Sequence, residues 1–156
     1  MDYLSTLHNV HGIIIADKHS FYDFGAVLAA RTVSYPQQIK ITERVPYSNT
    51  VYDFSYLYGN KTFEERSLTY ELIISEPTIP KRIKLNYRVQ EIVNWLYSGK
   101  GKKKLIDTYT PEYHFMAEIT DVTVEYSVGT AHIVSTWSAY PYRIPNENTI
   151  GLSEVL

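Results

Sequence analysis

The sequence of 156 residues contains no cysteine. Disulfide bonds, thiolate-ligated zinc and a thiol nucleophile are therefore excluded. No apolar run approaches the roughly 18 residues that a membrane-spanning helix needs. The N-terminal residues MDYLSTLHNVHG also lack the basic and apolar regions of a signal peptide. These absences predict a protein that folds in a cytoplasm, with no membrane anchor.

Motifs that carry chemistry are also scarce. GxSxG and GxxxxGK[ST] are absent, and the GKGKKK run follows a predicted helix, whereas a phosphate loop precedes one. The carboxylate pairs Glu64 with Glu65 and Asp107 with Glu112 are predicted to be solubilising charge. Metal ligation is a weak interpretation of the five histidines, which are His8, His11, His19, His114 and His132. We predict no catalytic residue, no metal and no cofactor.

What the chain does contain is tyrosine, with 15 residues, alongside 44% hydrophobic and 21% charged residues. Tyrosine is favoured in strands and at surfaces that are apolar on one side and wet on the other. The length suits one domain with a real core. We therefore expect a β-sheet protein whose exposed faces bind other surfaces.

Charge is unevenly distributed. Residues 81–104 hold eight Lys or Arg and one Glu, a balance of +7, whereas the remaining residues carry −9. This predicts a positive edge on an acidic body. The edge could bind phosphate or remain solvated beside a helix end, and the solvated interpretation is favoured.

One helix is predicted, over about 81–98. Its stripe follows a 3.6-residue period and consists of Leu85, Val89, Ile92, Val93 and Leu96. Pro80 precedes the pattern, and Gly99 and Gly101 follow it. The helix needs an apolar surface to pack on, which the flanking strands must supply.

Strands are predicted on both sides of this helix. Residues 62–75 form the longest candidate, with Leu68, Tyr70, Leu72 and Ile74 facing the helix. A change of alternation phase near Asp121 predicts a bulge. The segment 20–25 is expected to be a turn, 76–80 a rigid turn, and 146–156 a loose tail. The other strand candidates are 11–16, 26–32, 38–45, 104–108, 115–126 and 131–142.

Residues 46–59 are predicted to be a projecting hairpin, with a turn signal at Ser48 and Asn49. The many aromatic side chains in this short segment must pack either on the domain itself or on a neighbouring protein. Packing on a neighbouring protein is slightly favoured. The candidate oligomer interface consists of Tyr47, Tyr52, Phe54, Tyr56 and Tyr58.

The alternative function is a nucleic-acid-binding β module. It would use a basic patch of Lys100, Lys102, Lys103 and Lys104, with Trp95 stacking on single strands. Because Trp95 adjoins the apolar stripe, a packed indole is favoured.

The fold class expected is α+β, mostly β: a β-sandwich or split barrel of antiparallel strands with one packed helix and a projecting hairpin. The order of HSFYDFGAVLAAR, ITERVPYSNTVYDFS, ERSLTYELII, IVNWLYSGKGKKKLIDTYTPEYHFMAEITDVTVEY and STWSAYPYR resembles the N-terminal ring-forming domain of the siphophage distal tail protein (Dit), in the phage tail component family. The resemblance spans about 12–143.

The resemblance implies a structural phage or prophage tail protein and no enzyme. It implies a ring, expected to be a hexamer, at the distal end of the tail. The ring would be a hub joining the tail tube and tape measure to the baseplate and its receptor-binding proteins, with DNA passing through a central channel. The protein would be made in the host cytoplasm and reside in the virion. Residues 1–143 would be this domain and 144–156 a tail, or the start of a linker to an absent second domain.

Overall fold

A computed structural model of the chain describes residues 10–39, 42–44, 51–53, 62–80, 84–146 and 151–156, with the backbone alone at 42–44 and 51–53. Eight strands form one sheet, whose main path runs β2-β1-β7-β8-β9-β6-β3 with every pair antiparallel. The strands on this path are β1 (Ile13–Ile15), β2 (Lys18–His19), β3 (Val27–Val33), β6 (Arg66–Ser75), β7 (Lys103–Asp107), β8 (Tyr113–Ser127) and β9 (Thr130–Ala139).

The described residues also form elements outside this path. Strand β10 (Ile144–Pro145) pairs with β8, and β4 (Thr42–Arg44) pairs with β5 (Val51–Asp53) as a separate two-stranded sheet. The helical elements in the described ranges are α2 (Ser20–Phe24), η1 (Glu76–Thr78) and α3 (Leu85–Leu96). The prediction of a mostly-β, α+β fold with antiparallel strands is confirmed.

The sheet curls until its two ends approach each other, yet it does not close. The Leu28 amide of β3 donates a hydrogen bond to the His11 carbonyl, just before β1, at 3.1 Å. Arg31 of β3 forms an ion pair with Asp107 of β7 at 2.9 Å. The described strands of the body thus form one open, curled sheet, which is closer to the split barrel than to the sandwich that the sequence left open.

Helix α3 packs on the inner face of this curl. In β6 the even-numbered residues from Arg66 to Ile74 are buried, as the period-2 pattern predicts. Val89, Ile92 and Leu96 are buried, and Leu85 and Val93 pack partly buried on the same core. The indole N–H of buried Trp95 donates to the Ile15 carbonyl at 2.9 Å, so Trp95 is a packed residue as favoured.

Several boundaries differ from the sequence predictions. Residues 20–24 form a helix, not a turn, because the His19 ring caps the Phe21 and Tyr22 amides and Gly25 ends it at φ 83°. Helix α3 begins at Leu85, and the expected residues 81–83 lie outside the described part. Of the described strands, β8 is the longest with 15 residues, whereas β6 begins only at Arg66 and has 10. The register shift between Ile119 and Asp121 confirms the predicted bulge.

The C-terminal segment is more ordered, where described, than the loose tail predicted. The Asn146 side chain contacts the His114 ring at 2.9 Å and donates to the Pro111 carbonyl. Arg143 and Val155 pair as an antiparallel bridge. Sequence alternation could not reveal these contacts, because each is a single long-range pairing.

Candidate functional site

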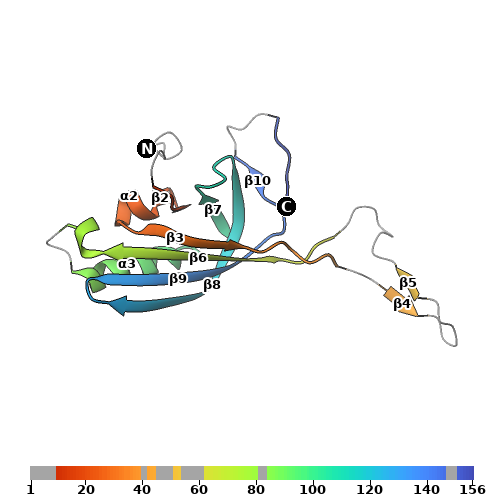
Figure 1. Cartoon of the computed structure of the whole chain (residues 1–156). Coiled ribbons are helices and arrows are strands. Elements are labelled where there is room, and N and C mark those ends of the chain that lie inside the picture. Colours follow the sequence, from red (N-terminus) through yellow and green to blue (C-terminus); the bar gives the residue numbers. More distant parts are fainter. Residues whose placement is uncertain (1–9, 40–41, 45–50, 54–61, 81–83, 147–150) are drawn as a thin grey trace.

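A two-stranded ribbon leaves one end of the sheet, and we call residues 34–65 the arm (Figure 1). In its first part, the Ile39 amide donates to the Thr62 carbonyl and the Glu64 amide to the Gln37 carbonyl, both at 2.8 Å. Farther out, β4 and β5 pair as a hairpin well away from the body. A projecting hairpin is therefore present as predicted, but its strands are 42–44 and 51–53. Of the predicted range 46–59, only 51–53 belongs to the described residues.

Arg66 fixes the point where the arm leaves the sheet. Its side chain is almost fully buried, with the residue 2% exposed. Its Nε donates to the Ser34 carbonyl at 2.9 Å and its Nη1 to the Pro141 carbonyl at 3.0 Å. Its guanidinium also lies over the rings of Tyr35 and Phe115, at 5.2 and 5.3 Å. One cation thus holds the first residues of the arm against the end of β9.

A second cation lies on the same ring. The Arg143 guanidinium is 5.3 Å from the Phe115 centroid. Burial, and secondarily the charge of Arg143, lowers the pKa of Arg66, although arginine stays protonated. Because a ring face attracts cations, Phe115 offsets part of the cost of placing two positive charges together.

A surface ion pair joins the arm base to the loop after α3. Lys102 Nζ lies 2.8 Å from Glu65 and 4.8 Å from the Tyr140 ring centroid. Glu65 also accepts a hydrogen bond from Ser138. The hydrogen bond from Lys102 is the main cause of the lowered pKa of Glu65. The loop 99–104 and the arm are therefore located at the same end of the molecule.

Aromatic side chains surround the arm base. Phe63 and Tyr142 meet edge to face at 6.0 Å, while Tyr35 is 71% exposed and Tyr140 is also exposed. Of the predicted interface residues, Tyr52 lies in β5, where only the backbone is described. The other four lie outside the described residues: Tyr47, Phe54, Tyr56 and Tyr58.

The four lysines of the predicted basic patch differ in their contacts. The Lys103 ammonium donates to the Leu96 and Ser98 carbonyls, both at 2.6 Å, and lies over the Trp137 ring. It completes the C-terminus of α3, and burial lowers its pKa. Lys102 is paired with Glu65. Lys100 and Lys104 remain exposed and have no ion pair among the described residues.

One carboxylate prediction is wrong. Asp107 is buried and does not serve as solubilising charge: it pairs with Arg31 and accepts the Tyr109 amide at 2.9 Å. Burial raises its pKa despite these partners. The Tyr70 hydroxyl, 3.4 Å away, also has a raised pKa because of burial. This cluster joins β3 to β7 where the backbone ladder is missing, a structural role.

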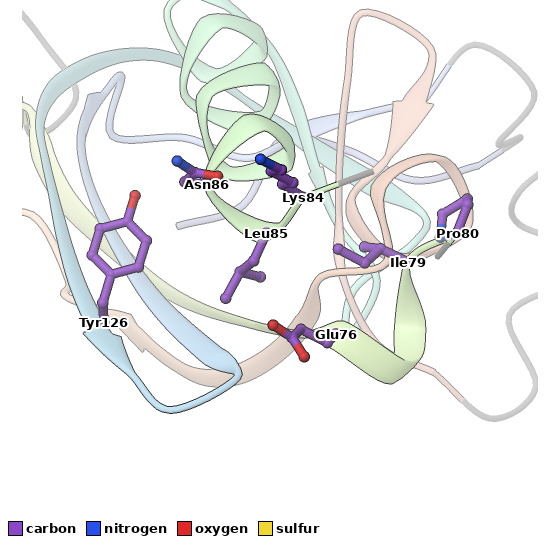
Figure 2. A pocket seen from close by; sticks show the side chains of 7 residues that line it. All are labelled: Glu76, Ile79, Pro80, Lys84, Leu85, Asn86 and Tyr126. Carbon is purple, nitrogen blue, oxygen red and sulfur yellow. The ribbon is translucent and has the colours of Figure 1, made fainter. Parts of the chain in front are cut away.

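A hollow of about 540 Å³ lies at the other end of the molecule. Figure 2 shows Leu85 between Tyr126 of β8 and Ile79, with Glu76 and Lys84 as its charged residues. Within the described ranges, no three His, Asp or Glu side chains converge to hold a metal ion. None of the helices described there has the length and apolar character to cross a bilayer.

Arg66 is the residue that sequence reasoning missed. Its position alternates in phase with Leu68, Tyr70, Leu72 and Ile74. The alternation alone could therefore have predicted that the Arg66 side chain points into the core. The partners of Arg66, Ser34 and Pro141, are 32 and 75 residues away. Such separations are not apparent from local spacing.

No family model and no curated protein matches the sequence. Among solved structures, the chain is similar to the crystal structure of SPP1 Dit (gp 19.1), described as a paradigm of the hub adsorption apparatus in phages infecting Gram-positive bacteria. The TM-score is 0.63 at 11% identity, over 86% of this chain and 52% of that one. The chain therefore has a Dit-like fold and spans about half the length of that protein.

Proposed function

We propose that the chain is a structural component of a phage tail. In this proposal its copies close into a ring, a hexamer, that acts as the hub between the tail tube and the receptor-binding tip. The Dit-like fold supports this role, because SPP1 Dit is itself described as a hub. Tape measure and baseplate proteins would be its neighbours in the virion, and DNA would pass through the opening.

The observation that carries the proposal is the arm. A two-stranded ribbon alone in water is marginally stable at best, yet this one extends away from the core with Tyr35 and Ile39 exposed at its base. An apolar surface on a neighbouring copy would stabilise it. When each copy contributes an arm at one end and receives one at the other, the contacts are head-to-tail and can close into a ring.

Mass photometry and negative-stain electron microscopy of the purified chain test this proposal. The expected result is a closed ring, with pairwise interfaces that bury more than about 1,000 Å². A chain that stays monomeric at the highest reachable concentration would contradict the proposal.

Arm variants test the route of assembly. Replacing Tyr52, Phe54 and Tyr56 together by Ser should leave a folded monomer, because the arm then lacks its adhesive side chains. The matched control replaces Tyr87 and Tyr97, which are exposed on and just after α3, and should still assemble. Rings formed equally by both variants would exclude the arm as the interface.

A further inference from the structure

The four strands β3, β6, β8 and β9 separate their charges by face. Their basic residues, Arg31 and Arg66, both have contacts on the core side, with Asp107 and Phe115. We call the face opposite α3 the outer face; Figure 1 shows the helix behind these strands. By strand register, the outer face carries all four of their acidic residues, which are Glu71, Glu118, Asp121 and Glu125.

No described helix covers the outer face, and its side chains are mainly hydroxyl-bearing, such as Thr69, Thr123 and Thr136. Asp121 and Glu125 are exposed there. Neither forms an ion pair among the described residues. The face is thus the convex side of the curled sheet, with polar and acidic side chains.

Uncompensated positive charge lies at the arm end. Lys100 lies in the loop after α3 and Lys104 is the second residue of β7, and both are exposed. We call residues 99–104 the basic loop, which the Lys102–Glu65 pair attaches to the arm base. Glu125 is aligned through His132 with Ile73, seven residues along β6 from Arg66. At about 3.3 Å per residue, that is roughly 20 Å from the arm end. Screening over about 10 Å in 0.1 M salt prevents the loop and Glu125 from neutralising each other within one copy. Asp121 is closer, because it is aligned through Thr136 with Thr69, three residues or about 10 Å from Arg66.

We propose that the basic loop of one copy lies against the outer face of the next copy, with Lys100 and Lys104 opposite Asp121 and Glu125. This inference rests on the proposed ring and identifies a second contact within it, beside the arm. The arm and the loop leave the same end of the molecule, so both reach the same neighbour. Exposed ion pairs contribute little affinity; their effect is on orientation and on the rate of encounter.

Charge reversal with mixing tests the contact. K100E/K104E makes the loop acidic, and D121K/E125K makes the outer face basic. Each variant alone should assemble at least tenfold more weakly than the unmodified chain in 0.1 M salt, because like charges then meet. An equimolar mixture should restore rings in which the two variants alternate, since every interface then joins opposite charges. Native mass spectrometry reads the composition of these rings.

The control E91K/E154K reverses two exposed acids elsewhere and should assemble normally. Circular dichroism confirms that each variant is folded. If both variants form rings as well as the unmodified chain, or if mixing restores nothing, the contact is wrong while the ring stands. Salt-sensitive oligonucleotide binding that K100E/K104E removes without affecting assembly would assign the loop to nucleic acid and also overturn the contact. An unmodified chain that never assembles overturns the ring and this contact together.

Discussion

At the scale of single residues, buried charged side chains join segments of the chain that are far apart in the sequence. Arg66 joins the arm to the end of β9, and Arg31 with Asp107 joins β3 to β7. Arg66 acts beside the backbone hydrogen bond from the Ser34 amide to the Ser67 carbonyl, at 3.1 Å. Removing one partner therefore leaves buried groups without hydrogen bonds.

Arg66→Ala should lower the free energy of unfolding by about 3 kcal/mol. The Ser34 and Pro141 carbonyls would each lose a charged donor, and two cation–π contacts would be lost with them. Lys100→Ala, at an exposed position, should change it by less than about 0.5 kcal/mol. Urea denaturation measures both. Equal effects would mean that Arg66 does not fasten the arm.

Because His19 is buried, we expect the free energy of unfolding to fall in acid. Burial lowers its pKa from 6.5 to about 4, and its neutral Nδ1 accepts the Phe21 and Tyr22 amides at the start of α2. The unfolded chain takes up a proton below pH 6.5 while the folded chain does not. The contribution is therefore complete above pH 6.5 and is lost as the pH falls towards 4.

That pKa difference corresponds to at most roughly 3 kcal/mol. In thermal unfolding from pH 7.5 to 4.5, His19→Asn, which keeps a capping acceptor and cannot titrate, should give a shallower pH dependence than the unmodified chain. An unchanged slope would exclude His19 as the source.

At the scale of elements, α3 is the part that local pattern predicts best. Its stripe needs only a 3.6-residue period, and the facing residues of β6 need only a period of 2, so both follow from neighbouring positions in the sequence. Helix α2 does not. It has five residues and a histidine cap, and its Phe24 side chain packs on Trp95 with centroids 4.9 Å apart.

Ile92→Ala should cost about 2 to 5 kcal/mol, because the side chain is fully buried beneath the sheet. Asn94→Ala, on the exposed side of the same helix, should cost less than about 0.5 kcal/mol. Chemical denaturation distinguishes them. A neutral Ile92→Ala would mean that α3 does not pack on this core.

At the scale of the whole molecule, the body has two unlike ends. One bears the arm, its aromatic base and the basic loop; the other has the β8–β9 turn and the hollow between Tyr126 and Leu85. The proposed ring requires head-to-tail contacts between two different surfaces, whereas a two-fold contact requires one self-complementary patch.

The sequence by itself determined the mostly-β class, the amphipathic helix, the bulge near Asp121 and the existence of the hairpin. Each is encoded by residues within a few positions of one another, through side-chain periodicity or turn chemistry. Only the tertiary structure decided that the sheet curls and stays open, that Asp107 is buried, that Lys103 completes a helix, and that Arg66 holds the arm. These outcomes depend on which distant strands come to lie together, and a buried charge is stable only when that arrangement supplies its partner.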